Sequence, residues 1–384
     1  MRFPTEIYDC IAAHVESASN IRYIGYLDWT HDAQHYSIWN DESRAKLATL
    51  RLVNKSFCYS ASVRLFRHLD ATFGLNTKIP PLVCLHKISQ SPNAMHVRHI
   101  DLGYLPEIRT STAEMKVFSN LRAISFGGPP ASLHEEHRKI HMNTVITALL
   151  YAPLSNLVEL ELFFPIANDF GKLFPAETSS LRTPIESILR RLRYLGLYVR
   201  DYTGTQDQRY DKQSVLPEHA ALPNNAHSSH LFKMVKLATN LESLAIASSD
   251  CLILDDPELL PQKRLRCLKL KSLSISSDGL LALVFQSRET MRYISLFQVQ
   301  LSSGTWQHVL SELYHLPHLL QFSIKSCGYS FTGTSSHLAS EIPPIDFPEA
   351  IETDNSLDKS ALKTLRYQVN LNKIAAGFST FFDY

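Results

Sequence analysis

A six-residue pattern returns along the chain from residue 97 onward, with apolar residues at its first, fourth and sixth positions. The copies begin at Val97, Leu121, Leu157, Leu192, Leu241, Leu270, Met291, Leu319 and Leu362, and the sixth can also be read from Leu265. Because the last two apolar residues of each copy are two positions apart, they fall on one face of an extended chain. The pattern therefore predicts a series of short strands that share one core.

The segments between these strands carry apolar residues at helical spacing. We expect helices over residues 143–151, 187–192, 230–239, 278–285 and 306–316. Strands that alternate with helices are typical of an α/β fold with a parallel sheet.

The repeated pattern resembles the leucine-rich repeat. In that family the strands line up as a parallel face, and helices or irregular turns form the outer layer of a solenoid. The copies here start 21 to 49 residues apart, whereas repeats of this kind are usually ~20–29 residues long. The resemblance thus implies an irregular, degenerate solenoid over residues 95–384, with insertions at 202–229 and 329–355. A generic α/β domain with a parallel sheet is the alternative.

The first seventy residues follow a different pattern. Ile7, Ile11 and Val15 recur every four residues, and a second apolar stripe runs through Leu47, Leu50, Val53, Phe57 and Ala61. Both stripes predict short amphipathic helices, the second one continuous. Helices this short cannot bury their apolar faces alone, so they must pack together or against a partner.

Three pieces of this region resemble the F-box, especially the versions abundant in filamentous fungi. The pieces are Phe3-Pro4-x-Glu6-Ile7, then Leu50-Arg51-Leu52-Val53-Asn54-Lys55-x-Phe57, then Leu65-Phe66-Arg67-His68-Leu69. The resemblance implies an F-box-like helical module over residues 1–70, in which an insert at about 16–45 replaces the family's shorter link. It also implies that the residues matching the motif bind a Skp-type adaptor; these are Pro4, Glu6, Ile7, Ile11, Leu50, Val53 and Phe57. The alternative is a helical cap on the solenoid.

Motifs for catalysis or cofactor binding are missing from the sequence: it has no G-x-G-x-x-G, P-loop or G-x-S-x-G. Two histidine groups could be considered for zinc, namely His134, His137 and His141, and His31 and His35 with Asp28 and Asp32. We interpret the first group as a solvated helix start and the second as incidental residues of a turn-rich insert. Asp255-Asp256 suits the start of a helix. We predict no catalytic residue, no metal and no organic cofactor.

Charge and cysteine content restrict the partners and the compartment. The 38 basic and 37 acidic residues leave a formal charge of +1, which offers no footprint for nucleic acid or an anionic membrane. The six cysteines are scattered without a C-x-x-C pair, so we expect reduced, mostly buried thiols. The first residues lack the apolar core of a signal peptide, and no apolar stretch approaches ~20 residues. We expect an intracellular protein, cytoplasmic or nuclear.

The two resemblances together imply the substrate-recognition subunit of an SCF-type (cullin-RING) ubiquitin ligase. Such a subunit performs no covalent step, since it holds a target protein near the transfer machinery. Two alternatives are a leucine-rich-repeat scaffold without a ubiquitin link and an enzyme whose active site has no sequence motif.

The variable positions of the strands are the candidate target-binding face, because they point away from the apolar core. On the best-formed strands the candidates are Glu159, Glu161 and Phe163, then Tyr194, Gly196 and Tyr198, then Tyr293, Ser295 and Phe297. The aromatic side chains are the most informative of these, because Tyr and Phe are enriched in interface hot spots. The target-binding candidates are therefore Glu159, Phe163, Tyr194, Tyr198, Tyr293 and Phe297. If the chain's own loops cover this face, the insertions at 202–229 and 329–355 are the next candidates.

Overall fold

The computed structural model describes residues 4–17, 41–71, 81–103, 117–128, 135–151, 154–174, 185–200, 203, 221–254, 264–330 and 351–378. The chain folds as two compact units. The first comprises residues 1–162 and 177–188, and the second comprises residues 163–176 and 189–384. Each unit combines parallel strands with helices, which confirms the predicted α/β class.

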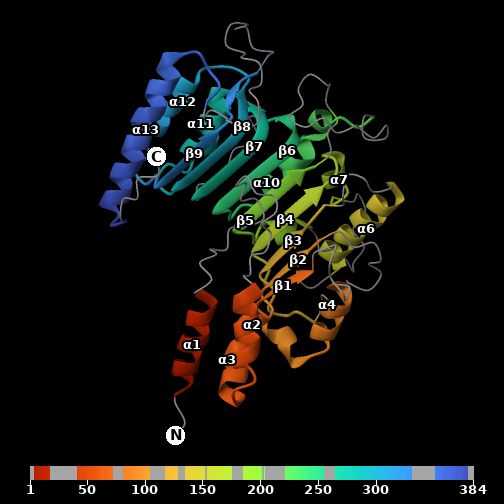
Figure 1. The fold of residues 1–384 in the computed structure, drawn as a ribbon. Coiled ribbons are helices and arrows are strands. Elements are labelled where there is room, and N and C mark those ends of the chain that lie inside the picture. Colours follow the sequence, from red (N-terminus) through yellow and green to blue (C-terminus); the bar gives the residue numbers. More distant parts are fainter. Residues whose placement is uncertain are drawn as a thin grey trace. The chain divides into compact units, whose positions relative to one another are not determined.

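The first unit begins with three helices, α1 (Thr5–Ser17), α2 (Asp41–Leu50) and α3 (Lys55–Leu65), which pack against one another (Figure 1). Ala12, Leu47 and Ala61, one from each helix, form the fully buried centre of this cluster. The predicted continuous helix through residues 47–61 is wrong. The side chain of Asn54 accepts a hydrogen bond from the amide of Phe57 at 2.9 Å and caps α3, so α2 and α3 are separate helices.

Four strands of the first unit pair in parallel and in chain order. They are β1 (His68–Ala71), β2 (His99–Leu102), β3 (Ala123–Phe126) and β4 (Glu159–Phe164), whose end belongs to the second unit. Helix α4 (Pro81–Ser89) and the 3₁₀ helix η1 (Pro92–His96) lie between β1 and β2 in the chain. Helix α6 (Glu135–Tyr151) precedes β4, and α8 (Ile185–Leu189) is the last described helix of the unit.

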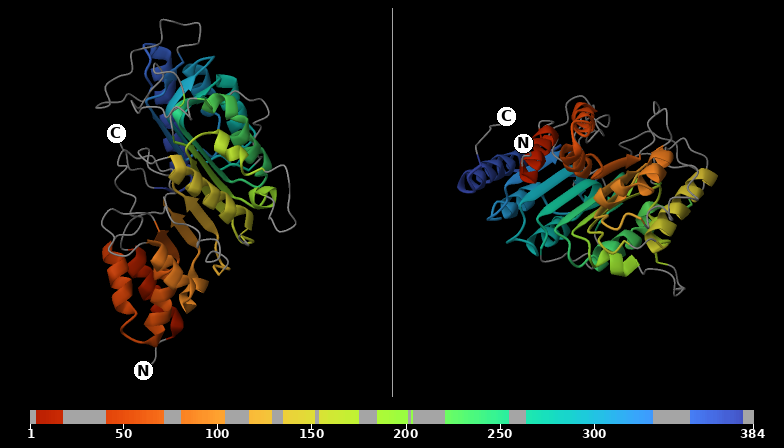
Figure 2. Two further views of the ribbon diagram at one scale, coloured as in Figure 1. Left: turned by 90° about the vertical axis from the view of Figure 1, so that its right-hand side faces the viewer. Right: turned by 90° about the horizontal axis from the view of Figure 1, so that it is seen from below.

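The second unit repeats this arrangement. Its strands are β5 (Tyr194–Val199), β6 (Ser243–Ile253), β7 (Cys267–Ile275) and β8 (Tyr293–Leu301), with β9 (Gln321–Lys325) and β10 (Gly328–Tyr329) both paired to β8. Its helices are α7 (Asn168–Gly171), η3 (Asn224–His227), α10 (Ser229–Leu237), α11 (Ser277–Phe285), α12 (Trp306–Leu313) and α13 (Ser356–Ala375). Helix α11 packs against α12, and α12 against α13, which lies beside the C-terminal strands (Figure 2).

The strand register decides between the two readings of the sixth copy of the pattern. Leu268 pairs with Leu244 of β6 and with Ile294 of β8, which are equivalent positions of neighbouring copies. The copy therefore starts at Leu265, and the reading from Leu270 is wrong. In the same way Leu69 of β1 pairs with Ile100 of β2. The stretch Phe66-x-x-Leu69-x-Ala71 is thus one more copy, which the sequence analysis missed.

The backbone is also repetitive. The amides of Arg98 and His99 both donate to the carbonyl of Arg67, and those of Arg122 and Ala123 both donate to Arg98. In the second unit the same pair of hydrogen bonds recurs at the start of β6, β7, β8 and β9. Further along the strands, Ser272, Gln298 and Ser326 occupy equivalent positions and all have a φ near +50°. Neighbouring copies thus share backbone conformation as well as apolar spacing.

The predicted strand at Leu362 is wrong, because residues 356–375 form helix α13. Leu362, Leu365 and Val369 are buried at helical spacing, whereas Tyr367 is 65% exposed. Apolar residues three and four positions apart lie on one helix face, and the capping side chain of Asn355, which accepts a hydrogen bond from the amide of Leu357, also favours the helix here.

The predictions about membrane spans and about cysteine burial can be compared with the described residues. No helix among them is both long and apolar enough to cross a membrane. The five cysteines whose side chains are described are free thiols, and only Cys327 among them is buried, so the expectation of mostly buried thiols is wrong for these five. Burial raises the pKa of the Cys327 thiol to about 12.

Candidate functional sites

The helical module presents apolar side chains to solvent. Ile7 and Ile11 lie one turn apart on α1 and are each 41% exposed, and Val53, in the turn before α3, is 60% exposed. Leu52, next to Val53, is 87% exposed, although it was not among the predicted adaptor-binding residues. We call these four residues the module's apolar surface. When a partner covers exposed apolar side chains, their removal from water stabilises the complex.

The other predicted adaptor-binding residues divide between surface and core. Pro4 and Glu6 are exposed at the start of α1. Leu50 packs against the buried centre of the module, and Phe57 lies edge-on against Tyr8, with ring centroids 4.7 Å apart. Leu50 and Phe57 therefore support the module from within, while Ile7, Ile11 and Val53 remain accessible.

The predicted target-binding residues of the second unit lie on the strand face opposite the leucine core. Phe163, Tyr194, Tyr198, Tyr293 and Phe297 are all partly exposed. The rings of Phe163 and Tyr198 are 4.9 Å apart. These side chains are neither buried beneath other parts of the chain nor fully free, so they form a partly exposed aromatic face.

Lysines accompany the aromatic residues on β7 and β8. The ammonium of Lys269 lies 5.5 Å from the ring centroid of Tyr293, and that of Lys271 lies 5.2 Å from the centroid of Phe297. Burial lowers the pKa of Lys271 to about 8. Lys325, the register partner of Phe297 on β9, also has its pKa lowered by burial. The face therefore combines aromatic rings with lysine side chains, two of which lie over a ring.

The predicted residues on β4 behave differently from the rest. Glu159 is partly exposed, but Glu161 is buried and accepts a hydrogen bond from the Ser125 hydroxyl at 3.1 Å. A buried carboxylate bound to its neighbour cannot meet a protein partner, so Glu161 is not a target-binding residue. Gly196 is buried as well, and Ser295 is partly exposed.

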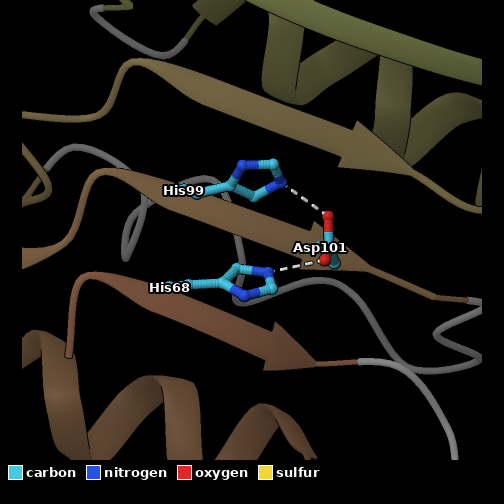
Figure 3. A group of neighbouring side chains, drawn as sticks. All are labelled: His68, His99 and Asp101. Atoms are coloured by element: carbon cyan, nitrogen blue, oxygen red, sulfur yellow. Dashed lines mark hydrogen bonds and ion pairs between the residues drawn. The ribbon is translucent and has the colours of Figure 1, made fainter. Parts of the chain in front are cut away.

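A cluster that the sequence analysis did not anticipate joins β1 to β2. The Nε2 atom of His68 lies 2.6 Å from Oδ2 of Asp101, and the Nε2 atom of His99 lies 2.7 Å from Oδ1 of the same carboxylate (Figure 3). His68 and Asp101 are 5% and 2% exposed, and His99 is partly buried. Burial raises the pKa of Asp101, but hydrogen bonds and charge interactions with the two histidines outweigh burial and lower this pKa to about 2.

The sequence does contain a signal for this cluster. Residues 66–71 read Phe-Arg-His-Leu-Asp-Ala, and residues 97–102 read Val-Arg-His-Ile-Asp-Leu. The histidines occupy the same position of two neighbouring copies, and parallel strands place such positions side by side. Recognition of the copy at Phe66 would have predicted the pairing of His68 with His99 that the register shows.

The two histidine groups that the sequence analysis considered for zinc do not form this cluster. His141 is only 1% exposed, so the solvated helix start proposed for it is wrong. Burial lowers the pKa of His141 to about 4. His134, together with His31, His35, Asp28 and Asp32, lies outside the described residues, as does Asp255-Asp256.

Comparison with known proteins adds little to this picture. No protein-family model matches the sequence, and no curated protein is similar to it at a significant level. Among solved structures, the leiomodin-1 actin-binding site 2 aligns with 46% of this chain and 83% of its own, at 14% identity and a TM-score of 0.26. A similarity that weak supports no statement about fold or function.

Proposed function

We propose that the chain is a non-catalytic adaptor, the substrate-recognition subunit of an SCF-type ubiquitin ligase. Its F-box-like module would bind a Skp-type adaptor, and through it a cullin. Its irregular leucine-rich repeats would bind the target protein. The mechanism is proximity, since two binding events on one chain raise the effective concentration of the target near the transfer machinery.

The observation that carries the proposal is the module's apolar surface. Ile7, Ile11 and Val53 match the F-box motif, and all three are exposed on a module that has its own buried centre. A partner that covered them would gain roughly 25 cal/mol per Å² of apolar surface removed from water. A helical cap on a solenoid has no comparable reason to keep these positions apolar.

A set of charge substitutions tests adaptor binding. We expect Ile7→Asp and Val53→Asp to weaken binding of the full chain to a purified Skp-type adaptor more than about 100-fold, because a carboxylate buried without a partner costs several kcal/mol. Isothermal titration calorimetry measures the loss. Leu50→Asp should abolish binding too, but Leu50 packs against the buried centre of the module. The folding of this variant must therefore be checked by circular dichroism.

Ile374→Asp is the matched control. Ile374 is an exposed isoleucine on helix α13 of the second unit, so its replacement adds the same charge outside the proposed adaptor surface. Equal binding by folded Ile7→Asp, Val53→Asp and Ile374→Asp would contradict the F-box assignment. The chain would then be better described as a repeat-type interaction scaffold without a ubiquitin link.

Target binding is assigned to the aromatic face of the second unit. The repetition of strands and backbone hydrogen bonds supports a leucine-rich-repeat array, and the partly exposed rings offer anchors for a partner. Because Lys269 and Lys271 lie over two of these rings, we expect the target segment to carry acidic residues beside apolar ones.

Replacing Tyr194, Tyr198 and Tyr293 by Ala should reduce target capture by roughly thirtyfold or more, since loss of a hot-spot residue costs 2 kcal/mol or more. Lys269→Glu alone should also weaken capture, because it replaces an attraction for acidic target residues by a repulsion, and it should reduce the loss of capture at high salt. Quantitative mass spectrometry of proteins co-purified with each variant is the measurement, with adaptor binding as the internal control. Capture of the same partners in the same amounts by the triple variant would show that the target site lies elsewhere.

A further inference from the structure

The two histidines and the aspartate of β1 and β2 form a preorganised set of metal-ligand atoms. His68 and His99 are register partners on parallel strands, so both rings leave the same face of the sheet, with centroids 4.6 Å apart. Asp101 lies two residues beyond His99 and therefore shares that face. One atom from each of the three side chains lies within 4.8 Å of the others.

We propose that His68, His99 and Asp101 bind a divalent transition-metal ion, with Zn²⁺ as the best fit. Two imidazole nitrogens and one carboxylate oxygen are a donor set that zinc accepts, and three protein ligands leave the fourth tetrahedral position to water. This inference is independent of the adaptor function, and it departs from the sequence-based prediction that the chain binds no metal.

Zinc binding requires a rearrangement of the three side chains that leaves the backbone in place. Ligand atoms around a tetrahedral zinc ion with bonds of 2.0–2.1 Å are roughly 3.3 Å apart, compared with the present nitrogen–oxygen separations of 2.6 and 2.7 Å. The two nitrogens now contact different oxygens of Asp101, and one atom from each side chain lies within 4.8 Å of the others. Rotations of the two rings and of the carboxylate that bring both nitrogens and one oxygen to the tetrahedral spacing would admit the ion. His99 keeps 13% of its side chain exposed, which gives the ion a path of entry.

Electrostatics favours a cation at this position. The Asp101 carboxylate is almost completely buried, and a buried negative charge is costly unless a positive charge or several hydrogen bonds offset it. The two imidazoles already supply hydrogen bonds to both oxygens of this carboxylate. A dication bound to the same three atoms would neutralise the carboxylate directly.

The rival explanation is a purely structural hydrogen-bonded cluster, in which each imidazole donates to one carboxylate oxygen. The two explanations differ in a measurable way. If the cluster is purely structural, added metal leaves the stability of the chain unchanged. If it is a metal site, ion binding releases protons and stabilises the folded chain.

Titration of the full chain with zinc sulfate, after treatment with a chelator and desalting, tests the proposal. We expect one zinc ion per chain, detected by elemental analysis after gel filtration, and a thermal unfolding midpoint that rises with zinc concentration. Asp101→Asn and His68→Ala should each weaken zinc binding by about 100-fold or more, exceeding the 10–100-fold typical of residues that only contact a ligand. Cobalt(II) substituted for zinc should give visible absorption bands of a low-symmetry site, which both variants lose.

Asp70→Asn is the matched control. Asp70 occupies the position of β1 that pairs with Asp101, but its side chain is exposed and is not one of the three ligand candidates, so Asp70→Asn should weaken zinc binding far less than Asp101→Asn does. His99→Ala serves as the ligand variant if circular dichroism shows that the replacement of the more deeply buried His68 or Asp101 disturbs folding. The proposal is overturned if the wild-type chain takes up no zinc, or if folded ligand variants retain its stoichiometry and cobalt spectrum.

Discussion

At the scale of single residues, burial decides the chemistry of several histidines more than sequence neighbours do. His141 shares a helical spacing with His134 and His137, which suggested a common role, yet it packs inside the first unit. His68 and His99 are far apart in the chain, yet they meet at one carboxylate. The sequence predicts neither outcome without the strand register, because a histidine's surroundings are set by segments distant in sequence.

His141 makes the stability of the first unit dependent on pH. Its pKa is about 4 in the folded chain and ~6.5 when exposed. Between these two pKa values, His141 is therefore protonated in the unfolded chain but not in the folded chain. The stabilising contribution is complete above pH 6.5 and is lost as the pH falls toward 4, by up to about 3 kcal/mol.

We expect His141→Leu, which places an apolar side chain that cannot be protonated at this buried position, to reduce that loss markedly. Urea unfolding of both proteins at pH 7 and at pH 5 is the measurement. If the wild-type chain and His141→Leu lose the same free energy of unfolding between these two pH values, His141 does not carry the dependence.

At the scale of elements, the sequence predicts strands better than it predicts their limits. Eight of the nine copies of the apolar pattern coincide with β2 to β9, because a strand with one buried face needs apolar residues two apart. The ninth copy is helix α13, where the same residues satisfy helical spacing. The copy at Phe66 was overlooked because it overlaps the F-box-like motif, so β1 was not predicted.

Helix α13 is held by a buried carboxylate. Asp358 is fully buried and accepts hydrogen bonds from the amide of Gln307 at 2.7 Å, from the Tyr329 hydroxyl at 2.7 Å and from the Thr353 hydroxyl at 3.0 Å. It thereby joins α13 to the start of α12 and to β10. Burial, together with the neighbouring Asp358, raises the pKa of the Tyr329 phenol.

We expect Asp358→Ala to lower the free energy of unfolding by about 3 kcal/mol, since several donors lose a charged acceptor in a buried place. Asp354→Ala is the control, because Asp354 is exposed nearby and its loss should stay within about 0.5 kcal/mol. Urea unfolding followed by circular dichroism compares the two. Equal stability of both variants would mean that apolar packing alone holds α13.

At the scale of the whole molecule, the proposed function requires two binding surfaces on one chain. Of the seven predicted adaptor-binding residues, five are exposed and two support the module from within, a division that the sequence could not reveal because the motif does not separate contact from core. The insert at 16–45 lies mostly outside the described residues. The near balance of basic and acidic residues leaves apolar and aromatic contacts as the main source of affinity for a partner.

Calorimetric titration of the full chain with a purified Skp-type adaptor is the decisive test of the proposal that the N-terminal helices bind such an adaptor. We predict a 1:1 complex with a dissociation constant below ~1 μM, which residues 1–70 alone suffice to form. Absence of binding by the folded full chain at adaptor concentrations of tens of micromolar, which is tens of times above the expected ~1 μM, would contradict the F-box assignment.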